Sequence, residues 1–516
     1  MGYNPGVLQS PHVSPDEEAG VIEGSVEKHL GEASTPDYKV ESTNEHSTGT
    51  HLSPESEQKD IKEDILWVDF EPNDPRIPMN FPRRKKWFIT FIAGIATFIS
   101  AFAASAYNLG FRSMIRDLDC TEFQATVGLS VYPLGFGVVP MVTAAFSEEF
   151  GRQPLYFWSS VGFALMYLMI ALAPNIQTVI VGRFIQGAFA STGATMVGGT
   201  IADIWSPADR GLPMAWFSIA AIFSLGLSPV MAGWVEMNPK LEWKWIQWIQ
   251  MIFAVVFAFL VMFFLTETRS TIVLQKIVKD MRKKTGDNRY RARVEKPKIG
   301  RLIWISCTRP LRLLVTEPVV TSFSLWIGFC WGVLFCLVES ISGVFRLCMV
   351  STIGSVLGFL TSIYQERLYR KYYPSRGIEA RLLTPCIAAF LLPIGMFIYA
   401  WSSFSSVHWI LLCIGITIYM WGTFIVYLGV FTYLADCYGP YASSALAGQS
   451  LARNILGTVF PLFTQQMYRN LTYKWANTLF GFIALLMLPI PFVLFYYGPR
   501  IRMMSKFSRR ALEART

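Results

Sequence analysis

Charged residues are scarce in this chain of 516 residues. Only 16% are Asp, Glu, Lys or Arg, whereas a soluble domain usually carries about 25%. With 52% hydrophobic residues, the chain has too little polar surface for a soluble fold and indicates a membrane protein. The basic residues behind its net charge of +9 lie mainly in short stretches between apolar runs. This pattern indicates membrane topology and argues against binding to nucleic acid.

Cysteine and histidine are also scarce. The eight Cys are scattered and none belongs to a CxxC pair, so the sequence predicts neither a disulfide framework nor a metal cluster. Four of the five His lie within the first 51 residues. The HExxH, GxSxG and P-loop motifs of enzymes and nucleotide-driven pumps do not occur. We therefore expect no enzymatic activity, no cofactor and no metal site.

Apolar runs fill most of the chain after residue 86. A bilayer core of about 30 Å needs roughly 20 apolar residues per helix, and twelve such windows can be placed. The predicted spans are 87–109, 124–146, 154–174, 178–202, 212–235, 245–265, 318–342, 347–364, 382–402, 408–434, 441–466 and 475–497. They predict an all-α polytopic membrane protein with two six-helix bundles.

Five parts follow from these spans. They are a polar N-terminal tail over 1–86, expected to be disordered and cytoplasmic, an N-terminal bundle over 87–266, a basic cytoplasmic connection over 267–317, a C-terminal bundle over 318–497 and a cytoplasmic tail over 498–516. The N-terminal tail lacks the apolar core of a secretory signal, so insertion of the protein into the membrane is expected to rely on the first span.

Orientation follows from the loops. Basic residues crowd 83–86, the connection 267–316, 365–381 and 500–510, while the loops 174–177 and 402–407 on the opposite side hold none. The positive-inside rule therefore places both termini and the connection in the cytoplasm.

An internal repeat supports the division into halves. Asp203 at the end of the fourth span matches Asp436 at the end of the tenth, 233 positions later. Pro229 matches Pro461 with an offset of 232. Parallel repeats of six spans are typical of one large class of transporters. The two prolines would also weaken their helices locally, which suits bending but occurs in static bundles too.

Four motifs in order carry a resemblance to a known family. They are DPxxPxN at 74–80, a cytoplasmic-loop motif at 147–154, RxxQG at 183–187 and a diluted GxxxGPxxGG at 224–233, in which Ser and Ala replace three glycines. On these residues the chain, from about Val68 to Ser508, resembles the major facilitator superfamily and its fungal twelve-span drug:proton antiporter branch, which includes polyamine and multidrug exporters. This resemblance implies the major facilitator fold and function as a monomer.

The resemblance also implies an inner gate of salt bridges that form and break during alternating access. Its expected members are Glu148, Arg152, Asp203 and Arg210, all at cytoplasmic span ends. The plainer alternative is that each is a solvated loop charge.

Charges inside the spans are few, and each is a functional candidate because its insertion costs a few kcal/mol. Only Arg183, Glu339 and Arg453 lie clearly inside. Glu339 is a candidate proton carrier, together with Asp203 and Glu148, unless it meets water near the outer end of its span. Arg183 is either a buried anchor between helices or a residue that handles protons or substrate.

Polar and aromatic side chains on the expected cavity helices suit a bulky amphipathic solute, although some are expected to face lipid. The substrate candidates are Arg183, Gln186, Trp326, Trp331, Tyr419, Tyr427, Arg453 and Asn454. With two arginines against one glutamate in the spans, we expect a neutral, anionic or weakly charged substrate, and polyamines as poor ones.

The expected function is proton-coupled efflux of a small amphipathic drug-like compound or secondary metabolite. The membrane is expected to be the plasma membrane, with a vacuolar or other internal membrane as the alternative. Uptake of a nutrient, or a receptor or scaffold that transports nothing, are the rival hypotheses. The sequon at Asn470 lies so close to the membrane that we expect little glycosylation.

One hairpin is unusually short. From Pro318 to Glu366 there are 48 positions, against 61 in the matching stretch from Trp87 to Glu148. Either the outer vestibule is trimmed there or the gene model is in error.

Overall fold

A computed structural model describes residues 66–71, 74–206, 209–287, 289–292, 299–341, 345–402, 407–505 and 507–509. These residues fall into two compact units. The smaller comprises the described residues of Met1–Ile77 and Leu274–Val294, and the larger those of Pro78–Val273 and Glu295–Thr516.

The smaller unit contains a parallel pair of short strands. β1 (Leu66–Val68) pairs with β2 (Tyr290–Ala292), with Leu66 opposite Tyr290. The DPxxPxN segment begins as a tight turn in which Asp74 accepts hydrogen bonds from the backbone N–H of Arg76 at 2.8 Å and from its guanidinium at 2.7 Å. These bonds hold the pKa of the Asp74 carboxyl below its usual value.

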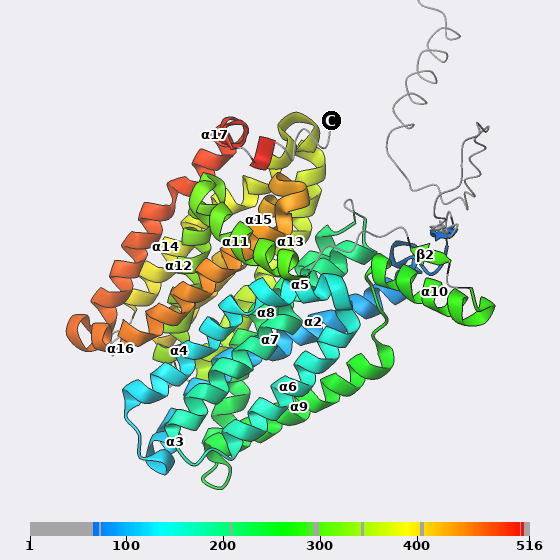
Figure 1. Cartoon of the computed structure of the whole chain (residues 1–516). Coiled ribbons are helices and arrows are strands. Elements are labelled where there is room, and N and C mark those ends of the chain that lie inside the picture. Colours follow the sequence, from blue (N-terminus) through cyan, green and yellow to red (C-terminus); the bar gives the residue numbers. More distant parts are fainter. Residues whose placement is uncertain are drawn as a thin grey trace, which may run out of the picture. The chain divides into compact units, whose positions relative to one another are not determined.

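The larger unit is helical, and every predicted span falls on a helix (Figure 1). The spans of the first half lie on α2 (Arg83–Ala106), α4 (Glu122–Val138), α5 (Pro140–Phe150), α6 (Arg152–Ala171), α7 (Ile176–Ile204), α8 (Gly211–Glu236) and α9 (Glu242–Phe264). Those of the second half lie on α12 (Pro318–Ile341), α13 (Phe345–Arg376), α14 (Leu383–Trp401), α15 (Trp409–Tyr438), α16 (Ala442–Met487) and α17 (Pro489–Met504).

Additional elements occupy the connections. The short η2 (Tyr107–Gly110) and α3 (Phe111–Leu118) extend α2, and η1 (Pro78–Asn80) precedes it. The predicted connection forms α10 (Ser270–Thr285) and α11 (Ile299–Thr316), and η3 (Gly377–Leu382) and η4 (Gly439–Tyr441) precede α14 and α16. α16 contains two helical segments, because Thr472 has a left-handed φ of 65°.

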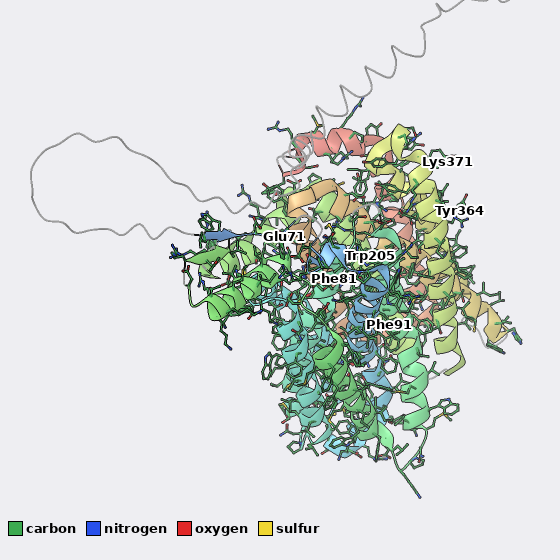
Figure 2. All side chains as sticks on the ribbon, turned by 90° about the vertical axis from the view of Figure 1, so that its right-hand side faces the viewer. Glu71, Phe81, Phe91, Trp205, Tyr364 and Lys371 are labelled. Atoms are coloured by element: carbon green, nitrogen blue, oxygen red, sulfur yellow. The ribbon has the colours of Figure 1, made fainter. Side chains whose placement is uncertain are left out.

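The apolar character of these helices is that of a multi-pass membrane protein. Within the described residues, nine helical segments are long and apolar enough to cross a membrane. Two of them, Thr352–Trp401 and Ala442–Met504, each contain two predicted spans, and α7 carries the remaining span. Large apolar side chains are exposed on the outside of the unit, among them Phe91 and Tyr364 (Figure 2). Such surfaces belong against lipid, so the all-α polytopic fold is confirmed.

The same packing occurs in both halves. α2 packs on α8 as α12 packs on α16, α4 on α7 as α13 on α15, and α6 on α7 as α14 on α15. The halves meet where α8 contacts α13 and where α16 contacts α4. This correspondence is the physical form of the repeat seen in the sequence.

Glycine allows the closest of these approaches. A methyl group on Gly187 of α7 would overlap the carbonyl oxygen of Tyr132 on α4. A methyl group on Gly135 of α4 would overlap the carbonyl oxygen of Phe184 on α7. The two backbones therefore touch, which is typical of small residues at helix contacts in membranes.

Candidate functional site

A cavity of about 520 Å³ lies between the two halves. Its lining comes from α2, α4, α5, α6, α7 and α8 of the first half, from α11, and from α12, η3, α15, η4 and α16 of the second half. It extends from Tyr132 and Arg453, within the bundles, to Arg152, Arg381 and Asp436 at the helix ends predicted to be cytoplasmic. We call these ends the predicted cytoplasmic end, and the end with α3 and the Thr472 kink the predicted outer end.

Arg453 on α16 is held against two aromatic rings in the wall of this cavity. Its guanidinium carbon lies 4.7 Å from the ring centre of Trp331 and 5.5 Å from that of Tyr427, and the two rings stack 5.3 Å apart. Arg453 Nη2 donates to Ser450 Oγ at 3.3 Å, and Nε has no acceptor within the described part of the chain. Asn454 beside it donates to the carbonyl of Ser450 at 2.7 Å. We call Arg453, Trp331, Tyr427, Ser450 and Asn454 the Arg453 cluster.

A group of ion pairs and hydrogen bonds around Arg152, which we call the Arg152 node, joins helix ends of the first half at the predicted cytoplasmic end. Arg152 opens α6 directly after Gly151, whose φ of 90° makes the tight turn from α5. Its Nε donates to Asp203 at the end of α7, at 2.6 Å, and its Nη1 donates to the carbonyl of Met196 at 3.2 Å. Gly199 leaves room for this guanidinium to lie across α7.

Glu267, just after α9, completes this node. Its carboxylate accepts the backbone N–H groups of Arg152 and Gln153, both at 3.1 Å, and those of Thr268 and Arg269, both at 2.9 Å. The first two are N–H groups at the start of α6, which lack partners within the helix, so a carboxylate there is favourable for both hydrogen bonding and the helix dipole.

The second half repeats the node. Arg381 in η3 donates from Nε to Asp436 at the end of α15, at 2.5 Å, and its Nη1 lies 3.5 Å from Glu366 of α13. The same guanidinium lies over the ring of Tyr369, 3.8 Å from its centre. Arg381 and Asp436 therefore occupy the places that Arg152 and Asp203 hold in the first half.

Arg210 interacts electrostatically with one carboxylate of each node, Asp203 and Asp436. Its guanidinium donates to the carbonyl oxygens of Trp205 at 2.9 Å and Ala202 at 2.7 Å, at the end of α7. Burial lowers the pKa of Arg210, and the carboxylates of Asp203 and Asp436 act in the opposite direction. Arg210 thus places a positive charge near one carboxylate of each half.

Contacts between the halves close the predicted outer end. Arg469 of α16 lies 2.8 Å from Glu122 of α4. One helical turn away on each helix, Gln465 Nε2 donates to Thr126 Oγ1 at 3.3 Å. Asn108 Nδ2 also donates to the carbonyl of Val338 on α12, at 2.9 Å. The cavity is therefore bridged at this end.

Several predicted substrate residues do not line the cavity. Arg183 and Gln186 are buried among α2, α4 and α7, where Arg183 Nη1 donates to Gln186 Oε1 at 2.8 Å. The Arg183 guanidinium lies 4.4 Å from the ring centres of both Tyr107 and Tyr132. Trp326 and Tyr419 are likewise buried away from the lining. In contrast, Trp331, Tyr427, Arg453 and Asn454 all line it.

For the remaining predicted site residues, the structure gives the helix on which each lies. Glu148 is on α5 and Glu339 on α12, and their side chains lie outside the described residues. Pro229 is inside α8 and Pro461 inside α16. Asn470 is exposed on α16, two residues before the Thr472 kink.

The sequence did not predict Glu267, Glu366 and Arg381 as members of the site, although Glu366 matches Glu148 in the comparison of the two halves. The repeat offset that relates Asp203 to Asp436 would have pointed from Arg152 to the region of Arg381, since the two pairs occupy matching helix ends. No motif marks Glu267, whose role depends on α9 ending beside the start of α6.

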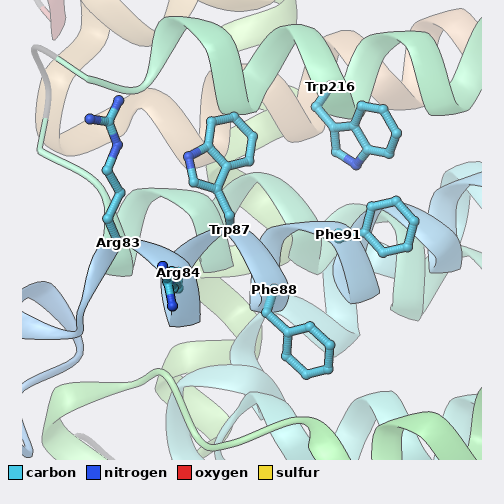
Figure 3. A pocket seen from close by; sticks show the side chains of 6 residues that line it. All are labelled: Arg83, Arg84, Trp87, Phe88, Phe91 and Trp216. Atoms are coloured by element: carbon cyan, nitrogen blue, oxygen red, sulfur yellow. The ribbon is translucent and has the colours of Figure 1, made fainter.

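A second, shallow depression lies on the outside of the first half. It is lined by Arg83, Arg84, Trp87, Phe88, Phe91 and Trp216 (Figure 3). Phe91 stacks on Trp216 with ring centres 5.3 Å apart. Apolar rings close to a pair of arginines are typical of the boundary between acyl chains and headgroups, so the composition of this surface suits a lipid interface.

Comparison with known proteins agrees with this architecture. The family model described as Major Facilitator Superfamily matches residues 93–438. The "MFS-type efflux pump MFS2" of Trichophyton rubrum is 34% identical over 87% of this chain and 78% of its own length. The "Ascochitine biosynthesis cluster MFS transporter" of Didymella fabae is 32% identical over 85% and 88%.

Solved structures are similar in fold. The partially occluded inward-open xylose transporter XylE from E. coli has a TM-score of 0.59 at 15% identity, covering 80% of this chain and 98% of its own. The human organic anion transporter MFSD10 has a TM-score of 0.55 at 15% identity, covering 80% and 99%. Since the family model matches well over half of the sequence and the relatives align along most of it, this chain belongs to the Major Facilitator Superfamily.

Proposed function

We propose that this protein exports a small amphipathic organic compound by alternating access, coupled to protons, as a monomer in the plasma membrane. The observation that carries this proposal is the central cavity. It is lined by both halves, bridged at the predicted outer end by the Glu122–Arg469 pair, and reaches the Arg152 and Arg381 nodes at the predicted cytoplasmic end. Such an arrangement suits a state that loads substrate from the cytoplasm.

The two nodes suit a rocking motion. Each ties helix ends within its own half, so each half can move as a rigid body. The contacts that must break when the outer end opens are the Glu122–Arg469 pair and the Gln465–Thr126 and Asn108–Val338 hydrogen bonds, because these join the halves. The Glu122–Arg469 pair is exposed and contributes at most about 1 kcal/mol, and a hydrogen bond contributes about as much, so the two states stay close in free energy.

The direction of transport rests on the relatives. The Trichophyton rubrum protein is named an efflux pump, and several others, including the Didymella fabae protein, are named transporters of biosynthesis clusters. By this likeness we favour export of a secondary metabolite or drug-like compound over uptake of a nutrient.

An export assay tests the proposal. Cells lacking the gene, and the same cells carrying it, are loaded with a panel of toxic amphiphiles and of the host's own metabolites, and the retained amount is measured. We expect lower retention of at least one compound in the complemented cells. Higher retention would indicate uptake, and equal retention across the panel would favour a receptor or scaffold. Robust export of spermine would contradict the predicted exclusion of polyamines.

Proton coupling needs its own test. Glu339→Gln and Asp203→Asn are compared with the unchanged protein in vesicles under an imposed pH gradient. We expect Glu339→Gln to abolish transport driven by the gradient while substrate binding remains. Unaltered pH dependence in both variants would exclude both carboxylates as the coupling site and leave Glu148, or no proton coupling.

A further inference from the structure

Arginines outnumber carboxylates in the described lining of the central cavity. Its charged residues are four arginines and one aspartate, namely Arg152, Arg210, Arg381, Arg453 and Asp436. Asp203 and Glu366, beside this lining, offset part of its positive charge through Arg152 and Arg381. The charge that remains favours anions, because charges in a confined space of low dielectric constant are poorly screened.

Three of the four arginines already have strong acceptors. Arg152 is paired with Asp203, and Arg381 with Asp436. Arg210 donates to two backbone carbonyls at the end of α7. Arg453 differs, because its one hydrogen-bonded acceptor within the described residues is the hydroxyl of Ser450, at the long distance of 3.3 Å.

A buried guanidinium with so few acceptors is costly unless something else compensates. The Arg453 residue is only 7% exposed, and Trp331 and Tyr427 provide ring faces within 4.7 and 5.5 Å of its guanidinium carbon. Cation–π contacts of this kind stabilise the charge over one face but leave the N–H groups at the edge unused. The planar edge of a guanidinium matches the two oxygens of a carboxylate.

Aromatic side chains continue from the Arg453 cluster along the cavity. Tyr427 lies 6.1 Å from Phe431 and 6.3 Å from Phe217, measured between ring centres, and Phe217 lies 5.6 Å from Phe431. These rings come from α8 and α15, so both halves contribute to the wall. A planar ring can stack on such a wall at little entropic cost.

The geometry points to a planar aromatic anion as the substrate class, with its acidic group on the edge of the Arg453 guanidinium and its ring along Tyr427, Phe431 and Phe217. This inference rests on the proposed transport function and narrows it. A cation would find Asp436 as the only carboxylate in the described lining, and Asp436 is already paired with Arg381. The cavity volume of about 520 Å³ lies in the range of sites for drug-sized molecules.

The experiment compares two probes that share one ring system and nearly the same shape but differ in charge. Radiolabelled 2-naphthoate and 2-naphthamide share ring and shape, but only the acid is charged at neutral pH. Equilibrium binding of each is measured on the purified full-length protein in lipid nanodiscs. We expect the unchanged protein to bind naphthoate about tenfold or more tightly than naphthamide, as one charge-assisted contact in a dry site can provide.

Variants test whether Arg453 is the residue that causes the preference for naphthoate over naphthamide. Arg453→Gln should bind the two probes with nearly equal affinity, whereas Arg453→Lys should keep part of the preference because it retains the charge but not the planar edge. Arg116→Gln is the matched control, since Arg116 is exposed at the predicted outer end and pairs with Asp117 and Glu242. It should keep the full preference. If Arg453→Gln does not fold, a reduced preference in Arg453→Lys carries the test.

Three results would overturn the inference. They are no naphthoate binding at millimolar concentration, equal binding of both probes by the unchanged protein, and a full preference that survives in Arg453→Gln. Failure of the proposed function would look different. In that case the preference for naphthoate and its loss in Arg453→Gln would remain in nanodiscs, while vesicles would transport neither naphthoate nor any compound of the export panel.

Discussion

Asp203 is the residue on which the first node depends. Its carboxylate pairs with Arg152, whose side chain is 10% exposed, while that of Asp203 is 18% exposed. Removing one partner of a fully buried pair costs about 3–5 kcal/mol, and the residual exposure here reduces that cost. We expect Asp203→Asn to lower the melting temperature of the purified protein by several degrees and transport by about tenfold or more. Thermal unfolding in detergent and transport in vesicles measure the two effects.

A nearby aspartate provides the control. Asp209 is exposed, and its carboxylate accepts a hydrogen bond from Ser206. Asp209→Asn should leave both quantities near their original values, because a surface hydrogen bond contributes little. If both variants behaved alike, the ion pair would have no special role in the node.

Helix packing depends on Gly187 of α7. A side chain there would meet the carbonyl oxygen of Tyr132 on α4, and backbone cannot move aside as a flexible side chain can. We expect Gly187→Val to destabilise the fold by roughly 3 kcal/mol or more, enough to abolish recovery of folded protein. Size-exclusion chromatography of detergent extracts measures the recovery. Gly300→Val on α11 is the control, since nothing lies within 4 Å of a methyl group at Gly300, and its recovery should be unchanged.

Closure of the predicted outer end depends on α4 and α16. Glu122 and Arg469 are 50% and 73% exposed, so their pair contributes at most about 1 kcal/mol. Glu122→Arg replaces attraction with repulsion and should shift the population modestly toward an open outer end. A cysteine at Thr126, a buried position, should then react about two to five times faster with a thiol reagent.

The double swap tests the direction of this effect. Glu122→Arg with Arg469→Glu restores opposite charges, so the labelling rate at position 126 should return to its original value. An unchanged rate in the single variant, or a rate that stays high in the double variant, would show that this pair does not control the outer end.

Orientation is a property of the whole molecule. The connection 267–317 should be cytoplasmic, and the turn between α8 and α9 should lie outside. We expect a membrane-impermeant maleimide on intact cells to label a cysteine at Asn238 but not one at Gly286, with the unmodified protein as background. Permeabilised cells should show labelling at both positions. Labelling of Gly286→Cys in intact cells would contradict the predicted cytoplasmic location of the connection.

Long elements of this fold were predictable because hydrophobic length is a local property. All twelve predicted spans lie on helices, and the Asp203–Asp436 repeat corresponds to matching node positions. The β1–β2 pair was not predicted, since parallel strands separated by more than 200 residues leave no local pattern. The additional helices α3, α10 and α11 were missed because they are polar or short and lie outside the apolar windows.

The sequence by itself determined which residues are chemically unusual in this protein. A charged side chain inside an apolar run is costly wherever it lies, so Arg183 and Arg453 can be recognised from their positions in the sequence. Only the tertiary structure decided that Arg453 lines the cavity, while Arg183 is buried within the first half beside Tyr107 and Tyr132. The physical reason is that a membrane helix is apolar on every side, so its sequence does not mark the face that meets the partner half. That face is decided by close backbone contacts such as that of Gly187 with Tyr132, which join helices distant in the chain.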